Sequence, residues 1–186
     1  MTEGPLLWFL NRSSGVVLLV LLTSAVALGV LAMGGRPGGK VPRFVSQSLH
    51  RNVALLSVVA LGVHVATAVM DTFVDIRWWQ TFIPVGSGFE PLWIGLGALS
   101  LDLLAVVVMT SLLRTRLRYR SWRMIHVSSW AAWVLAVAHG AGAGTDLPGA
   151  PWALVPTVLC VAVVAAALGG RMFLVVRDRS PVRSSR

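Results

Sequence analysis

The stretch MIHVSSWAAWVLAVAHGAGAGT, residues 124–145, contains no Asp, Glu, Lys or Arg and carries two histidines, His126 and His139. Its length matches the roughly 20 apolar residues that an α-helix needs to cross a bilayer. Charged side chains are rare in such segments because their burial in hydrocarbon costs free energy. The stretch therefore predicts a membrane-spanning helix with two imidazoles inside the membrane.

The remainder of the chain repeats this pattern. Of its 186 residues, 56% are hydrophobic and 12% are charged, whereas a soluble domain has about 25% charged residues. This composition excludes an ordinary soluble globule. It predicts an all-α membrane protein, with a bundle of five transmembrane helices in a single domain over residues 1–186. The predicted helices cover about residues 13–35, 44–70, 91–113, 121–143 and 149–176.

The distribution of charge predicts the orientation. Most of the 16 Lys and Arg residues lie after the first predicted helix, after the third, or in the C-terminal tail, and the positive-inside rule places these segments in the cytoplasm. The N-terminus is then outside and the C-terminus inside. The loop over 71–90 faces outside, where its aromatic residues suit an interfacial cap. The net charge of +9 does not indicate nucleic acid, because the cations flank apolar runs rather than forming one basic surface.

A possible cleavage site and the single cysteine both lie in apolar runs and have alternative interpretations. Ala25-Val26-Ala27 resembles a signal-peptidase site. A signal peptide begins with a basic region, whereas here the charges of Glu3 and Arg12 cancel and the cations follow the apolar run. Retention as a spanning helix is therefore preferred. Cys160 is the single cysteine and lies in an apolar run, which argues against an intrachain disulfide or a cysteine-based metal site.

The chemistry of the chain is predicted from its four histidines, which fall in two of the predicted helices. His50 and His64 lie over 44–70, and His126 and His139 over 121–143. Both helices run from inside to outside, so each pair has an inner and an outer member, at levels about 20 Å apart. Neutral imidazole is a good ligand for iron. We therefore predict two b-type haems, each between the second and fourth helices: His50 and His126 bind the inner haem iron, His64 and His139 the outer one.

This pairing has one geometric difficulty and two alternatives. On an ideal helix, His139 lies about 140° from His126 around the axis; the width of haem, side-chain rotamers, or a bend or π-bulge would compensate. Imidazoles that only make interhelical hydrogen bonds remain an alternative. Zinc or copper is disfavoured because each level offers only two ligands.

Several motifs resemble a known family. Leu49-His50-Arg51 through His64, Trp122 through His126, and His139-Gly140 are similar to the ferric reductase-like transmembrane domain of ferric reductases, NADPH oxidases and the haem-binding subunit of the bacterial methionine sulfoxide reductase system. Pro91 to Gly97, followed by Leu101-Asp102-Leu103, resembles bacterial members. The resemblance implies bis-histidine haems that carry electrons across a bacterial plasma membrane.

The expected partners follow from the resemblance and from one departure. Family members that reduce iron or oxygen carry a region that binds FAD and NAD(P)H, whereas residues 177–186 hold no nucleotide-binding fingerprint. We expect no flavin bound by this chain, a cytoplasmic flavoprotein reductase or quinol as electron donor, and an extracytoplasmic acceptor. Whether the chain is itself an enzyme stays open; an oxidoreductase component is favoured. The alternatives are a quinone-linked cytochrome b anchor for an external redox enzyme and, in another class, a haem-free transporter or assembly factor.

Charged residues near the histidines are predicted to bind the anionic haem carboxylates through charge-assisted hydrogen bonds. The candidates are Arg51 and Arg123 for the inner haem, and Arg12 or Arg77 for the outer one. Asp102, alone within an apolar run, is expected to make an interhelical hydrogen bond, with a proton or quinone role as the alternative. Glycines 62, 95, 97 and 140 are expected to permit close helix or haem packing.

Overall fold

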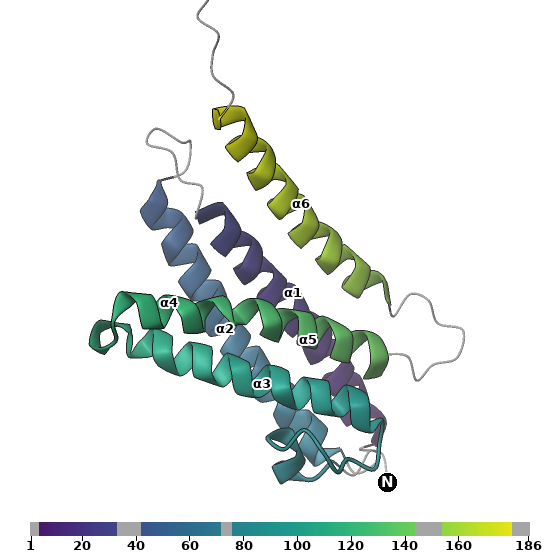
Figure 1. Ribbon diagram of the computed structural model, residues 1–186. Helices are drawn as coiled ribbons and strands as arrows, with labels where there is room; N and C mark the ends of the chain where they lie inside the picture. Colours follow the sequence, from purple (N-terminus) through teal and green to yellow (C-terminus); the bar gives the residue numbers. More distant parts are fainter. Residues whose placement is uncertain (1–3, 33–41, 72–75, 144–153, 180–186) are drawn as a thin grey trace, which may run out of the picture.

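The computed structural model of this chain is all-helical and describes residues 4–32, 42–71, 76–143 and 154–179. Five helical segments are long and apolar enough to cross a membrane. This confirms an all-α chain with five candidate spans (Figure 1). In chain order the elements are α1 (Gly4–Ala32), α2 (Arg43–Met70), η1 (Trp78–Thr81), α3 (Pro91–Leu112), η2 (Arg114–Arg116), α4 (Tyr119–Val127), α5 (Ser129–Ala143) and α6 (Val155–Arg179).

The first helix begins earlier than the sequence predicts. α1 starts at Gly4 rather than near residue 13, because the two polar residues just before residue 13 find partners on other helices. Asn11 Nδ2 donates to His64 O at 3.0 Å, and Arg12 Nη1 donates to Ala143 O at 2.6 Å. Polar side chains are tolerated within a span when neighbouring helices satisfy them. The predicted start of the last helix at 149 lies outside the described residues.

Helix boundaries and exposed surfaces both agree with a lipid environment. A chain in hydrocarbon must satisfy its backbone groups internally, and helices do so. Pro91 occupies the first turn of α3, where its missing N–H is not needed, and Glu90 before it has a positive φ of 37° that turns the chain into the helix. Large apolar side chains such as Val59 and Phe173 are 67% and 66% exposed, as expected for helices that face lipid.

The helices form two crossing layers (Figure 1). α1 packs against α2 on one side and α6 on the other, whereas α3 packs along α5. α2 and α5 make few direct backbone contacts, so the two layers meet mainly through α1 and through side chains. A buried apolar cluster joins them at mid-depth, and there Trp133 Nε1 donates to Thr23 Oγ1 at 3.0 Å. Its buried members are Leu18, Leu22, Trp133 and Val164.

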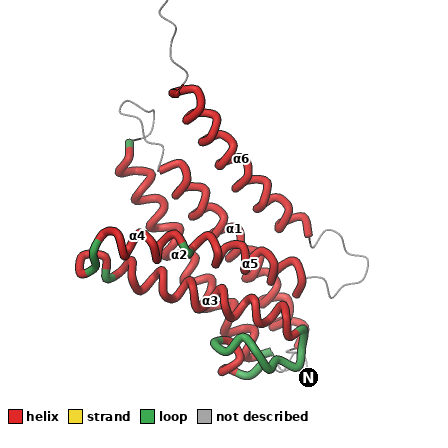
Figure 2. The backbone as a smooth tube through the Cα atoms, in the orientation of Figure 1, coloured by secondary structure: helices red, strands yellow, loops and turns green. Residues whose placement is uncertain are grey.

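The fourth predicted span consists of two helices in sequence. α4 ends at Val127 and α5 begins at Ser129, with a short non-helical interruption between them that Figure 2 shows. The backbone N–H of Ser128 donates to Ile125 O at 3.0 Å, which is the tighter hydrogen-bond spacing of a 3₁₀ turn. The Ser128 hydroxyl donates to the same carbonyl at 2.6 Å. Tighter winding here changes the angular relation between the residues before and after Ser128.

An ordered segment covers the end of the bundle where α3 begins. Gln80 of η1 is buried; its Nε2 donates to Gly86 O at 2.6 Å, and its Oε1 accepts from the backbone N–H of Arg77 at 2.8 Å. Pro84 O lies so close to α3 that a Cβ at Gly95 would approach it to 2.5 Å. Gly95 is therefore required for this close contact, as the sequence predicts for one of its glycines.

Candidate functional site

The four histidines lie in two close pairs, each with one imidazole from α2 and one from α4 or α5. The ring centroids of His50 and His126 are 6.1 Å apart, with ring planes 71° from parallel. Those of His64 and His139 are 6.2 Å apart, with planes 73° from parallel. The two pairs therefore have nearly the same internal geometry.

The spacing within each pair fits axial ligation of one metal ion. Two imidazoles bound on opposite sides of an ion, each through a bond of about 2 Å, place their ring centroids about 6 Å apart. Within the described ranges no cluster of three or more His, Cys, Asp or Glu side chains suits a metal ion. A bare zinc ion requires three or four protein ligands, so two imidazoles alone do not complete such a site.

Backbone carbonyls orient three of the imidazoles. His50 Nδ1 donates to Ala25 O at 2.9 Å, His64 Nδ1 to Asn11 O at 3.1 Å, and His139 Nδ1 to Trp93 O at 2.8 Å. A carbonyl only accepts, so the proton is on Nδ1 and the lone pair of the neutral ring is on Nε2. A hydrogen bond of this kind typically fixes the tautomer and direction of a metal-ligating histidine.

The fourth imidazole has a different partner. His126 Nδ1 lies 3.4 Å from the hydroxyl of Ser111 on α3. A hydroxyl both donates and accepts, so this contact leaves the tautomer of His126 open. The inner pair is thus held less firmly than the outer one.

Small residues on α1 and α3 lie against the imidazoles. A Cβ added to Gly15 would come within 3.0 Å of the His64 ring, and one on Gly29 would come within 3.6 Å of the His50 ring. A Cβ on Gly97 would reach 2.8 Å from His139 Nδ1. Gly97 is among the glycines predicted from the sequence to permit close packing, whereas Gly15 and Gly29 are not. Their separation equals that of His50 and His64, which is the signal that could have revealed them.

The interruption at Ser128 lies between His126 and His139 and changes their angular relation. An uninterrupted helix would separate their directions by about 140°. The 3₁₀-like turn at Ser128 overwinds the chain between them, and both rings end beside a histidine of α2. The sequence-derived expectation of a helix irregularity is met, in the form of overwinding rather than a π-bulge.

Of the arginines, Arg12 is the one near the outer pair. It lies within electrostatic range of both His64 and His139, and its guanidinium lies 5.5 Å from the ring centroid of Trp8. Arg77, the other candidate, is exposed beside η1. The structure brings Arg12, rather than Arg77, to this end of the site.

At the inner pair three side chains form a stack. The Trp122 ring stacks on His126 with centroids 4.9 Å apart and planes 23° from parallel. The Arg114 guanidinium lies over the Trp122 ring at 5.0 Å, and Arg114 is within electrostatic range of His126. Arg51 and Arg123, predicted from their sequence position, are both exposed.

Other predicted residues take lesser positions. Asp102 is half-buried and makes no hydrogen bond within the described part of the chain, whereas Ser100 on the same helix donates to Ala132 O at 2.8 Å. The interhelical hydrogen bond expected of Asp102 is therefore made by Ser100. A Cβ at Gly62 or Gly140 would meet open space, so these two glycines do not serve close packing between helices.

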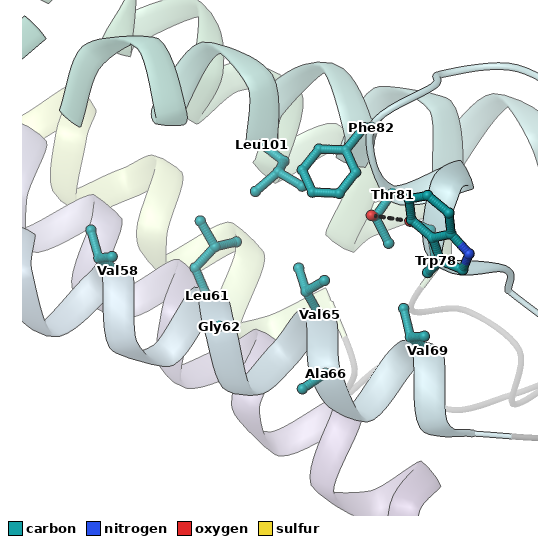
Figure 3. A pocket seen from close by; sticks show the side chains of 10 residues that line it. All are labelled: Val58, Leu61, Gly62, Val65, Ala66, Val69, Trp78, Thr81, Phe82 and Leu101. Atoms are coloured by element: carbon teal, nitrogen blue, oxygen red, sulfur yellow. Dashed lines mark hydrogen bonds between the residues drawn. The ribbon is translucent and has the colours of Figure 1, made fainter. Parts of the chain in front are cut away.

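An apolar cavity of about 480 Å³ opens between α2 and α3 beside η1 (Figure 3). Gly62 and Val65 on its α2 wall are sequence neighbours of His64, so the cavity lies at the level of the outer pair. Its lining carries no charged side chain, and its hydroxyl group, on Thr81, donates to Trp78 O at 2.6 Å. The cavity is an apolar flank of the site and offers little to a polar substrate.

Neither a scan against models of protein families nor a search of curated proteins finds a match to this chain. Functional inference therefore rests on the geometry of the paired histidines and on the sequence motifs around them.

Proposed function

We propose that this protein binds two b-type haems, one between His50 and His126 and one between His64 and His139, and conducts electrons across the membrane through them. The observation that carries the proposal is the spacing of the two pairs, 6.1 and 6.2 Å between ring centroids. A prosthetic group that supplies four equatorial ligands needs two further ligands on one axis, and each pair offers them.

Electron transfer is favoured over oxygen binding because both axial positions would be filled. Bound haem supplies one-electron oxidation and reduction of its iron. With two histidine ligands no coordination position stays open for oxygen. The roles of the chain are to hold the imidazoles, to leave Nε2 of His50, His64 and His139 free to bind a metal, and to exclude water around them.

The orientation of the chain sets the proposed direction of transfer. The arginines of η2 and α4 are exposed, and the positive-inside rule assigns them to the cytoplasm. Electrons then enter at the inner pair from a cytoplasmic flavoprotein or a membrane quinol, and leave at the outer pair to an extracytoplasmic acceptor. We propose membership of the ferric reductase-like transmembrane family on the motifs around His50, His126 and His139.

The apolar layer between the two pairs supports a two-step path. Leu18, Leu22 and Trp133 are buried. Trp133 lies between His126 and His139 in the chain, and the two leucines lie between Gly15 and Gly29, which contact His64 and His50. Such packing excludes water and ions from the space between the two sites. Each site is therefore able to hold its own charge state while the other changes.

The test is the visible spectrum and haem content of the purified protein. We expect two haems per chain in a pyridine haemochrome assay, and a reduced-minus-oxidised spectrum of low-spin b type. One haem per chain would overturn the two-site proposal. A haem-free protein would overturn the function and favour the transporter or assembly-factor class.

A further inference from the structure

One buried donor in the described part of the chain lacks a partner. Trp122 Nε1 is shielded from solvent and makes no hydrogen bond there. By contrast, the other indole near the site with a buried donor, Trp133, donates to Thr23. A buried N–H without an acceptor costs free energy, and in folded proteins such groups commonly pair with a bound ligand or water.

The position of Trp122 connects this donor to the inner histidine pair. Trp122 precedes His126 by four residues and stacks on its imidazole at 4.9 Å, so the two side chains share one face of α4. His50 lies on the opposite side of the same pair, 6.1 Å from His126. The unpartnered Nε1 therefore belongs to a side chain that contacts one member of the inner pair.

The charge beside the donor indicates what kind of acceptor it would take. Arg114 lies over the Trp122 ring at 5.0 Å, and the arginines at 116, 118, 120 and 123 belong to the same basic segment. An N–H donor near a guanidinium suits an anionic oxygen, in a carboxylate or a phosphate. The anionic oxygens near this point would come from a haem carboxylate or from a lipid headgroup.

We propose that Trp122 Nε1 donates a hydrogen bond to a carboxylate of the inner haem, with Arg114 supplying the neighbouring positive charge; this rests on the proposed function. Haem is favoured over lipid because Nε1 is buried and its ring contacts a ligand of the inner pair, whereas a lipid phosphate stays at the membrane surface. Trp122 is a positioning residue that does not touch the iron.

The hydrogen bond has a consequence for the inner reduction potential. An unscreened carboxylate favours the ferric ion, because the ferric state carries one more positive charge. A hydrogen bond and a cation reduce that effect and raise the potential. Replacing Trp122 with Phe keeps the ring but removes the donor, so the inner potential is expected to fall.

The test uses Trp122→Phe in a His64→Ala background, which isolates the inner haem, with Trp78→Phe as the matched control because Trp78 is 70% exposed. The proteins are placed in nanodiscs of zwitterionic lipid and loaded with haem b or with its dimethyl ester. A lower midpoint potential in Trp122→Phe, seen with haem b and absent with the ester and in the control, supports the proposal.

Other outcomes overturn it in distinguishable ways. An unchanged potential in a protein that binds haem rejects the hydrogen bond and leaves the proposed function standing. A shift that persists with the ester, or that appears only when anionic lipid is added, assigns the acceptor to lipid phosphate. Failure of the wild type to bind haem rejects both proposals. If Trp122→Phe does not accumulate, Arg114→Gln is used instead, since it removes only the cation. An unchanged inner midpoint potential in Arg114→Gln then rejects the proposal.

Discussion

A Cβ atom at Gly97 would lie 2.8 Å from Nδ1 of His139, closer than real side chains approach. The same imidazole nitrogen donates to Trp93 O. α3 therefore holds one side of the ring, and His64 is its neighbour on α2. α3 thus sets the position of an imidazole that belongs to α5.

This contact predicts different effects for two glycine substitutions. Gly97→Ala should displace the His139 ring and remove most of the outer haem, while the inner haem stays. Gly29→Ala is the matched control, because its Cβ would lie 3.6 Å from the His50 ring, an ordinary contact distance. Haem content and difference spectra of the two variants measure the effect. Equal retention of haem by both would contradict the close contact.

The angle between the ring planes predicts the magnetic signature of the bound haems. The planes are 71° and 73° from parallel in the two pairs, and nearly perpendicular axial imidazoles leave the iron d orbitals almost degenerate. Both ferric haems should therefore give the large-gmax type of low-spin signal in low-temperature EPR spectra. A rhombic signal typical of parallel imidazoles would show that the rings rotate on binding.

The pairing predicts which substitutions have the same effect. His64→Ala and His139→Ala should each remove the same spectral component, and the double variant should lose little more, because members of one site are not additive. His50→Ala and His126→Ala should likewise remove the other component. Spectra of the four single variants and two double variants give the comparison. A shared phenotype for His64→Ala and His126→Ala would refute the pairs.

The charge of Arg12 is expected to affect the outer haem alone. Arg12 is within electrostatic range of both outer histidines, and loss of a nearby cation favours the ferric state. Arg12→Gln should lower the outer midpoint potential by on the order of 50 mV, which corresponds to roughly a tenfold change in a one-electron equilibrium. Arg77→Gln serves as the control, since Arg77 is exposed beside η1. Potentiometric titration of the two variants measures the outer midpoint potential. Equal shifts of that potential in both would exclude a specific role for Arg12.

The orientation is tested by labelling introduced cysteines. Val85 is 68% exposed near η1, and Ser121 is exposed on α4 at the other end of the bundle. In a Cys160→Ala background, Val85→Cys should react with an impermeant maleimide in intact cells, whereas Ser121→Cys should react only after lysis. The reverse pattern would invert the proposed direction of electron flow.

The sequence by itself determined the five candidate spans and the depths of the histidines. A long apolar run has one stable solution in lipid, a helix that satisfies its own backbone, so hydropathy alone locates it. Once the spans are placed, the rise per residue fixes how deep His50, His64, His126 and His139 lie. This is why the two levels were predictable without knowledge of the packing.

Only the tertiary structure decided what surrounds each imidazole. The angular relation between His126 and His139 is altered by the tightened turn at Ser128, which hydropathy does not record. That Arg12 rather than Arg77 lies near the outer pair depends on how α1 is rotated against α2 and α5. Helix rotation and helix pairing are set by side-chain packing between distant segments, and such contacts leave no local pattern in the chain.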